Sequence, residues 1–269
     1  MDPDKTFFDP DQIHQRGKLT LDLIRKAWVE MGERRINPNC DPGFLRSQFP
    51  TQAPEDPSTF EEVCKETEEK YLPGVLHWQS PKFFAYYPMC TSDISMYAEM
   101  IAQAFVCPAF SYSVSPSHTE LENVMMDWMV TAMKLPDKFL ISNSGGGAII
   151  GTASEGMVLA IHTAKLRKMA EKGLGLDNPE ILKLVGYYSE TTHISTSKTL
   201  ILKDIAHRRA VPCYMDEKIG NYIVNVKKLR GMIEKDLKDG LIPFYYGASV
   251  GATFSAAIDQ IDEIGEICR

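Results

Sequence analysis

The sequence predicts an α/β fold with a mainly parallel sheet flanked by helices. Two observations lead to this prediction. From about residue 153 onward, helical and strand-like segments alternate, and a glycine-rich stretch at 145–151 comes directly before the first of these helices. Alternation of this kind is typical of parallel sheets whose crossover connections are helices. Helices are expected at about 153–171, from 195, at 225–238 and at 257–268, and strands at 184–188, 210–214 and 242–248.

The first 75 residues predict helices and a long loop rather than a compact domain. Residues 11–33 carry an amphipathic helical pattern, and the prolines of residues 34–57 discourage regular structure. Ser58 and Glu61 fit a capping box at the start of a second helix, which reaches about Tyr71. Two arrangements suit such a start: it wraps a neighbouring subunit, or it packs on its own domain.

The middle of the chain is rich in aromatic residues. Residues 72–88 are aromatic and bounded by prolines, a composition that suits either the lining of a pocket for a planar ligand or core packing. A helix is expected at 92–106, followed by a loop at 107–116. Ser117 or Thr119 is the expected cap of the next helix, whose stripe of Met and Trp residues predicts a core-facing side.

The glycine-rich stretch is a candidate phosphate site. Because glycine lacks a Cβ atom, backbone N–H groups at 145–147 and Gly151 can approach a bulky anion. The helix that starts there adds free N–H donors and the positive end of its dipole, and Thr152 and Ser154 add hydroxyl groups. The alternative is a tight loop with an ordinary N-cap. The motif is neither a Walker loop nor a dinucleotide-binding fingerprint.

The composition narrows the possible partners. The formal net charge is -7 and no basic stripe is present, which argues against nucleic acid as a partner. No apolar run reaches membrane-spanning length, and the polar N-terminus is unlike a secretory signal. The six cysteines form no CxxC motif, so neither a disulfide framework nor a metal site is predicted. Reduced thiols predict a cytoplasmic location.

Blocks that carry a family likeness run from about residue 10 to the end of the chain. The carrying blocks are Leu72-Pro73-Gly74-Val75, His77-Trp78-Gln79-Ser80-Pro81, Phe84-Ala85-Tyr86-Tyr87-Pro88, Ser115-Pro116, Thr119-Glu120-Leu121-Glu122, Met125-Met126-Asp127-Trp128, Gly145-Gly146-Gly147, Gly151-Thr152-Ala153-Ser154-Glu155 and Gly240-Leu241-Ile242-Pro243-Phe244. Together they resemble the group II pyridoxal-phosphate-dependent amino-acid decarboxylases, in particular the branch of aromatic-L-amino-acid decarboxylase and histidine decarboxylase. Such a match is specific for the family but gives little information about the substrate.

The resemblance implies a fold type I domain of the pyridoxal-phosphate-dependent transferases and pyridoxal 5'-phosphate as the cofactor. It implies that His193 stacks on the cofactor ring and assists proton transfer, although a lone histidine at a strand end is otherwise a structural residue. It also implies a substrate-binding role for aromatic residues, in part across a dimer interface. The implied cofactor-binding residues are Thr152, Ala153, Ser154, His193 and Thr253, and the implied substrate-pocket residues are Trp78, Tyr86, Tyr87, Pro88 and Phe110.

The resemblance also implies a domain division. Residues 1–75 are expected to form a helical segment that packs on a partner subunit, and residues 76–269 an incomplete, C-terminally truncated cofactor-binding domain. The family's Schiff-base lysine and the aspartate that pairs with the pyridine nitrogen belong to a part that lies beyond Arg269, and no lysine here follows an Asn-x-x-His pattern. Met89 stands where relatives carry a small hydroxyl residue.

Three functions remain open at this point. The chain is part of a decarboxylase that converts an aromatic or imidazole L-amino acid to its amine, or it belongs to the aldehyde-forming relatives. Alternatively, 269 residues are the whole product, which then serves as a catalytically inactive binding or dimerisation partner in a homodimer or heterodimer. The third reading is a module that binds a phosphate ligand through the glycine loop alone.

Overall fold

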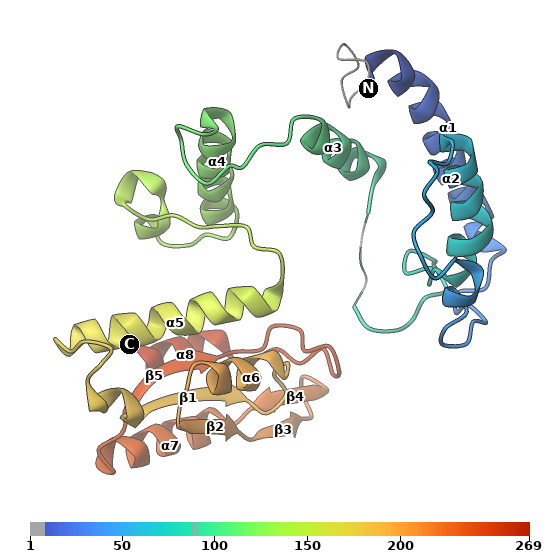
Figure 1. Ribbon diagram of the computed structural model, residues 1–269. Coiled ribbons are helices and arrows are strands. Elements are labelled where there is room, and N and C mark those ends of the chain that lie inside the picture. Colours follow the sequence, from blue (N-terminus) through green and yellow to red (C-terminus); the bar gives the residue numbers. More distant parts are fainter. Residues whose placement is uncertain (1–8, 88, 90) are drawn as a thin grey trace. The chain divides into compact units, whose positions relative to one another are not determined.

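The computed structural model describes residues 9–87, 89 and 91–269 (Figure 1). The chain divides into two compact units, Met1–Ala104 and Phe105–Arg269, and each is described by itself. The first unit therefore extends past the boundary at residue 75 that the sequence suggests. Among the described residues, no helix is both long and apolar enough to cross a membrane.

The first unit consists of helices joined by long loops. Its helices are α1 (Pro10–Val29), α2 (Phe60–Glu66), which continues as a π-type turn at Thr67–Tyr71, and α3 (Asp93–Ala104). The capping box of α2 is formed by Thr59 and Glu62, so the predicted pair Ser58 and Glu61 is wrong by one residue. Both pairs fit the same sequence pattern, and the extended backbone of Thr59 makes it the residue that precedes the first helical turn.

The first unit has no buried hydrophobic side chain among its described residues, and only His77 and Ser80 are buried there. Large apolar side chains are instead exposed along its helices, such as Val29 at 69% and Ile94 at 76%. A domain of this size that folds on its own normally encloses an apolar core. The first unit therefore lacks an independent source of hydrophobic stabilisation.

The second unit contains a three-stranded parallel sheet in the order β2-β1-β5, which confirms the predicted α/β fold. Helix α6 connects β1 to β2, α7 lies in the connection from β2 to β5, and Figure 1 shows α5 and α7 on opposite sides of the strands. The strands are β1 (Leu184–Ser189), β2 (His207–Val211) and β5 (Ile242–Gly247). The helices are α4 (Pro116–Ala132), α5 (Ala153–Glu171), α6 (Ser195–Leu202), α7 (Val226–Lys238) and α8 (Ile261–Cys268).

Two hydrophobic clusters lie on the two faces of this sheet because successive side chains of a strand point to opposite faces. Leu184 of β1 packs with α5 and α6 residues in one cluster, and Val185 and Tyr187 pack with α7 and α8 residues in the other. Gly186 faces α6, and a Cβ atom there would lie 2.6 Å from the Leu200 side chain. The missing side chain thus permits the close approach of α6 to β1.

A proline divides one predicted strand in two. The strand expected at 210–214 ends at Val211, and after Pro212 the chain forms β3 (Cys213–Asp216), which pairs with β4 (Asn221–Val224) in an antiparallel hairpin. Proline has no N–H to donate to a sheet, so the parallel ladder stops there. The hairpin is absent from the predicted elements.

Two helix starts also differ from the prediction. Helix α4 begins at Pro116 with Ser115 as its N-cap residue, so the expected caps at Ser117 and Thr119 are wrong. Proline is favoured at the first helical position because its missing N–H has no intrahelical partner there. Helix α8 begins at Ile261 rather than near 257.

A charged group is buried between α7 and the sheet. Asp236 of α7 is 3% exposed and accepts a hydrogen bond from the Tyr187 hydroxyl at 2.7 Å. Arg209 of β2 donates to both carboxylate oxygens, at 2.9 and 3.2 Å. Two hydrogen bonds from one guanidinium offset the free-energy cost of removing a carboxylate from water. The cluster therefore fixes α7 against β1 and β2.

Candidate functional site

The glycine-rich stretch has a different local role from the one that the sequence suggests. The N–H groups of Gly145 and Gly146 donate to the carbonyl oxygens of Leu140 and Phe139, so they are not available to an anion. A Cβ atom on Gly145 would lie 2.2 Å from the Phe139 backbone. The first glycines therefore serve close packing of the loop, and the predicted approach of their N–H groups to an anion is wrong.

The start of α5 retains the donors that a phosphate needs. Thr152 and Glu155 form a capping box, in which the Thr152 hydroxyl accepts from Glu155 N–H at 3.2 Å and Glu155 Oε2 accepts from Thr152 N–H at 3.0 Å. The next two N–H groups, of Ala153 and Ser154, occupy the first two helical positions, which have no intrahelical acceptor. Both residues are exposed. Two N–H donors and the Ser154 hydroxyl thus face solvent at the positive end of the α5 dipole.

His193 lies in the loop between β1 and α6, at the carboxyl end of β1. The first turn of α6, directly after this loop, contacts the first turns of α5, because the Thr196 hydroxyl donates to Sδ of Met157 at 3.2 Å and the Ser195 hydroxyl oxygen lies 3.3 Å from the same sulfur. Met157 is in the same helix as Ala153, four residues further on. The fold therefore brings the loop of His193 next to the helix end that carries the free N–H donors.

Ser195 orients the imidazole ring of His193. Its backbone N–H donates to Nδ1 at 3.2 Å, and its hydroxyl oxygen lies 2.7 Å from the same nitrogen. A nitrogen that accepts a hydrogen bond carries no proton, so the neutral ring holds its proton on Nε2. Because His193 is exposed, this Nε2–H group is free to face a ligand. Ser195 is therefore a positioning residue.

Replacement of Ser195 by Ala is expected to increase the fraction of the Nδ1–H tautomer of His193, because one of the two donors to Nδ1 is lost. The measurement is the pair of imidazole ¹⁵N chemical shifts in the 269-residue chain. Ser197→Ala is the matched control, since the Ser197 hydroxyl donates to Ile194 O and does not contact the ring. An unchanged tautomer ratio in Ser195→Ala would show that the hydroxyl does not orient the ring.

A second loop meets the loop of His193 at the same edge of the sheet. The Ser249 hydroxyl, just after β5, donates to the Thr192 hydroxyl at 2.7 Å, and Ser249 N–H donates to the buried Asp259 carboxylate at 2.8 Å. Burial raises the pKa of Asp259 above its ordinary value. Thr253 belongs to this second loop and is exposed. The carboxyl ends of β1 and β5 thus carry connected loops, which is the usual ligand-binding edge of a parallel sheet.

The predicted substrate-pocket residues lie in both units. In the first unit, Trp78 stacks on Tyr86 with ring centroids 5.4 Å apart and planes inclined by 18°. Trp78 and Tyr86 also line a pocket of about 530 Å³ together with Phe83 and Met89. Tyr87 is exposed there, and Pro88 lies outside the described residues. Phe110 belongs to the second unit, where its side chain is 80% exposed.

Sequence reasoning missed three residues that organise the site. Ser195 and Ser249 are serines in loops, and no periodic pattern distinguishes them from other surface serines. Their contacts with His193 and Thr192 depend on how β1, β5 and α5 are brought together. Asp259 was equally inconspicuous, although a lone acidic residue next to an apolar run, as in Ala256-Ala257-Ile258-Asp259, is a signal for a buried carboxylate.

Comparison with known proteins gives a consistent family match. The family model described as the pyridoxal-dependent decarboxylase conserved domain matches residues 42–269. Aromatic-L-amino-acid decarboxylase of Bos taurus is 36% identical over 266 residues, which cover 96% of this chain and 53% of the relative. Histidine decarboxylase of Rattus norvegicus is 35% identical over 270 residues, which cover 97% of this chain and 40% of the relative.

A solved structure agrees with these sequence matches. The crystal structure of Catharanthus roseus tryptophan decarboxylase in complex with L-tryptophan superposes with a TM-score of 0.88 at 30% identity. The match covers 98% of this chain and 55% of that protein. The chain thus spans about half the length of the aromatic-L-amino-acid and tryptophan decarboxylases that it matches.

Proposed function

The chain belongs to the pyridoxal-dependent decarboxylase family, and we propose that it takes part in decarboxylating an aromatic or imidazole L-amino acid to its amine. The cofactor of this family is pyridoxal 5'-phosphate. The observation that carries the proposal is the pair of free N–H donors at Ala153 and Ser154, next to the loop that presents His193. In this proposal the chain supplies the phosphate-binding and substrate-lining half of the site.

The residues at the start of α5 fit the phosphate group of this cofactor. Ala153 N–H, Ser154 N–H and the Ser154 hydroxyl can each donate to a phosphate oxygen, and the helix dipole favours the negative charge. The nearby Glu155 carboxylate repels the negatively charged phosphate. The hydrogen bonds to the phosphate and the helix dipole must outweigh this repulsion. Binding of the phosphate here would leave the rest of the cofactor next to the His193 loop.

Each remaining residue has a task in the proposed reaction. When bound, pyridoxal 5'-phosphate provides an electron sink for the electron pair that remains as CO2 leaves. His193 would cover the cofactor ring with its Nε2–H group available to assist proton transfer. Thr253, in the loop after β5, would contact the cofactor. Trp78, Tyr86, Tyr87, Pro88 and Phe110 stay the proposed substrate-lining residues, in part across a dimer interface.

The aromatic surroundings support a planar substrate side chain. The stacked rings of Trp78 and Tyr86 provide flat apolar surfaces, against which indole, catechol or imidazole groups can stack. The test is release of labelled CO2 from carboxyl-labelled amino acids by the decarboxylase of which this chain is the phosphate-binding half, supplied with pyridoxal 5'-phosphate. We expect release from aromatic amino acids or histidine and none from glutamate or aspartate. Release from the acidic amino acids alone would contradict the proposal.

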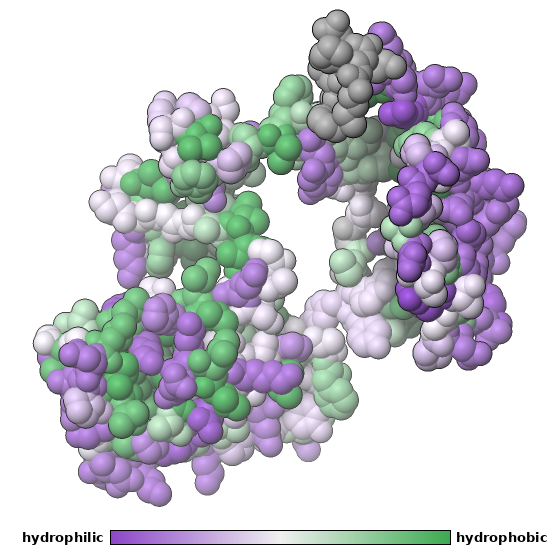
Figure 2. Space-filling view, viewed as in Figure 1, coloured by the Kyte–Doolittle hydropathy of each residue, from purple (hydrophilic) through white to green (hydrophobic). Residues whose placement is uncertain are grey.

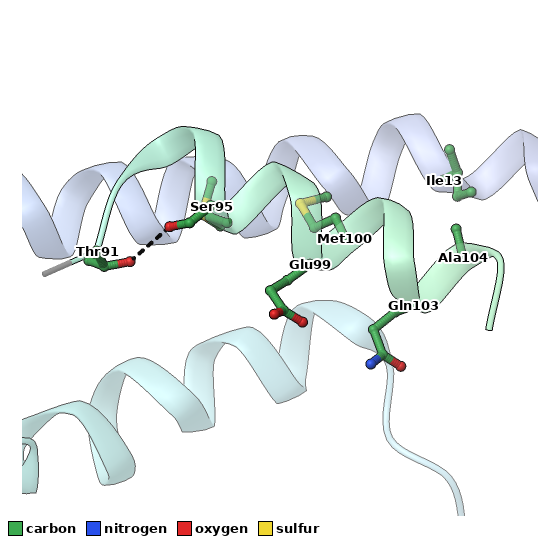
Figure 3. Close-up of a pocket in the computed structure, with 8 residues that line it drawn as sticks. Ile13, Thr91, Ser95, Glu99, Met100, Gln103 and Ala104 are labelled. Atoms are coloured by element: carbon green, nitrogen blue, oxygen red, sulfur yellow. Dashed lines mark hydrogen bonds between the residues drawn. The ribbon is translucent and has the colours of Figure 1, made fainter. Parts of the chain in front are cut away.

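The exposed apolar helices of the first unit support a dimer in which residues 1–75 pack on a partner subunit. A groove of about 820 Å³ lies between α1 and α3, and Figure 3 shows Glu99 and Gln103 projecting from the same side of α3. Val29 of α1, within residues 1–75, is 69% exposed. Hydrophobic side chains also appear at the surface of both units in Figure 2. Covering such surfaces in a second subunit removes apolar area from water.

Replacement of Val29 by Glu is expected to weaken self-association of the chain by about tenfold or more, because a charge would be buried at the interface. The measurement is sedimentation equilibrium over a range of concentrations. Ile219→Glu is the matched control, since Ile219 is 63% exposed but lies in the turn between β3 and β4. A wild-type chain that stays monomeric and melts cooperatively would contradict the dimer.

A cytoplasmic location forms part of the same proposal. The five cysteines in the described part of the chain are all free thiols. Free thiols are typical of proteins in reducing compartments.

A further inference from the structure

Three side chains with nucleophilic or basic groups meet just before α4, outside the site described above. The Cys107 thiol donates to the Ser115 hydroxyl oxygen at 3.2 Å, and this oxygen lies 2.7 Å from Nδ1 of His118. Cys107 Sγ is also 3.4 Å from the same nitrogen. The three groups therefore form a closed triangle in which a proton can pass from sulfur to imidazole, directly or through the hydroxyl.

The N-terminus of α4 and an imidazole ring both lie beside Cys107. Ser115 is the N-cap residue of α4, so the sulfur lies near the positive end of a 17-residue helix. Thiolates are stabilised by helix N-termini and by neighbouring imidazolium groups. Cys107 is partly exposed and His118 is exposed, so a small reagent can reach the sulfur.

The other described cysteines lack this arrangement. In the described part of the chain, the Cys40 thiol donates to a backbone carbonyl oxygen. The Cys213 sulfur contacts two hydroxyl groups and a backbone carbonyl oxygen. Of the five described cysteines, Cys107 is the one whose sulfur has a histidine nitrogen within 4 Å. Cys268 is the exposed one, while Cys107 is only partly exposed. Accessibility alone therefore ranks Cys268 first in reactivity, whereas the Ser115–His118 contacts rank Cys107 first.

We propose that Cys107 is a site of covalent modification by soft carbon electrophiles, with His118 as the base and Ser115 as the relay. With iodoacetamide, a bond forms between Sγ and the methylene carbon while the carbon–iodine bond breaks and iodide leaves with the electron pair. The thiol proton moves to the Ser115 oxygen, and the Ser115 hydroxyl proton moves to Nδ1 of His118. The modified residue lies three positions before Phe110 in the same loop.

The test is the rate of alkylation of each cysteine by limiting iodoacetamide, followed by peptide mass mapping of the 269-residue chain. We expect Cys107 to react before Cys268, and His118→Gln to slow Cys107 by about tenfold while the rate at Cys268 stays the same. Ser115→Ala is expected to slow Cys107 as well. His162→Gln is the control, because His162 contacts no cysteine among the described residues.

Two results would overturn the proposal. In the wild-type chain, faster alkylation of Cys268 than of Cys107 would show that accessibility governs reactivity, and this comparison does not depend on any variant. An unchanged rate at Cys107 in His118→Gln would show that the imidazole does not act as the base. An unchanged rate at Cys268 in the same variant verifies that the fold is retained.

Discussion

Replacement of Asp236 by Ala is expected to lower the free energy of unfolding by about 3–5 kcal/mol. Asp236 is 3% exposed and holds both the Arg209 guanidinium and the Tyr187 hydroxyl. Without the carboxylate, the Tyr187 hydroxyl loses its buried partner and the Arg209 charge loses its counter-ion. The measurement is urea unfolding followed by circular dichroism.

A neighbouring acidic residue provides the control for this prediction. Glu234 lies on the same helix but is exposed, so Glu234→Ala removes the same charge and is expected to change stability by less than about 0.5 kcal/mol. Equal effects of the two substitutions would show that net charge or helix propensity, rather than the buried contacts, governs the stability of this region.

The pH dependence of Asp236 follows from its pKa. Burial opposes the charged form, but the hydrogen bonds from Arg209 and Tyr187 outweigh burial and lower the pKa of Asp236 below its ordinary value. A lowered folded-state pKa adds stability that is present above the unfolded-state pKa of about 4 and is lost as pH falls through the folded-state value. The difference in stability between wild type and Asp236→Ala should therefore shrink in acid.

Replacement of Ala153 by Pro is expected to weaken binding of pyridoxal 5'-phosphate by about tenfold to a hundredfold. The reason is the loss of one N–H donor to a charged oxygen, which contributes about 1.5–3 kcal/mol. Proline is tolerated at the first position of a helix, and the extended backbone of Thr152 suits a residue before proline. Thr152 and Glu155 keep their capping box, since Ala153 takes no part in it.

The measurement for Ala153→Pro is equilibrium dialysis of pyridoxal 5'-phosphate against the chain, with thermal unfolding as the check on the fold. Ala153→Ser is the matched control because it changes the side chain but keeps the N–H group. We expect Ala153→Ser to bind like wild type. If Ala153→Pro also binds like wild type, the N–H group of residue 153 does not hold the phosphate.

The sequence predicts local structure well where a pattern has a single physical solution. The helix start expected at about residue 153 is confirmed, and the structure attributes it to the reciprocal capping box of Thr152 and Glu155. The parallel sheet follows from buried strands that alternate with helices. Where two solutions share one pattern, as with Ser58 and Thr59, only the structure distinguishes them.

The tertiary contacts of the site could not be predicted in this way. The link between Ser249 and Thr192 joins residues 57 positions apart, and nothing in either local sequence specifies it. The glycines at 145–147 have the composition of an anion loop, yet backbone contacts with Phe139 and Leu140 use the N–H groups of the first two. The hairpin after Pro212 was missed because a proline interrupts a strand only where its N–H would be needed to pair with a neighbouring strand. The local sequence does not show which neighbour that is.

In the proposed function, the start of α5 receives the cofactor phosphate. The most direct measurement is the change in the amide ¹H and ¹⁵N signals of Ala153 and Ser154 during titration of the 269-residue chain with pyridoxal 5'-phosphate. Pyridoxal, which lacks the phosphate, is the matched ligand. We predict saturable shifts of both amides with pyridoxal 5'-phosphate and much smaller shifts with pyridoxal; equal shifts with the two ligands, or none at these amides, would contradict the claim.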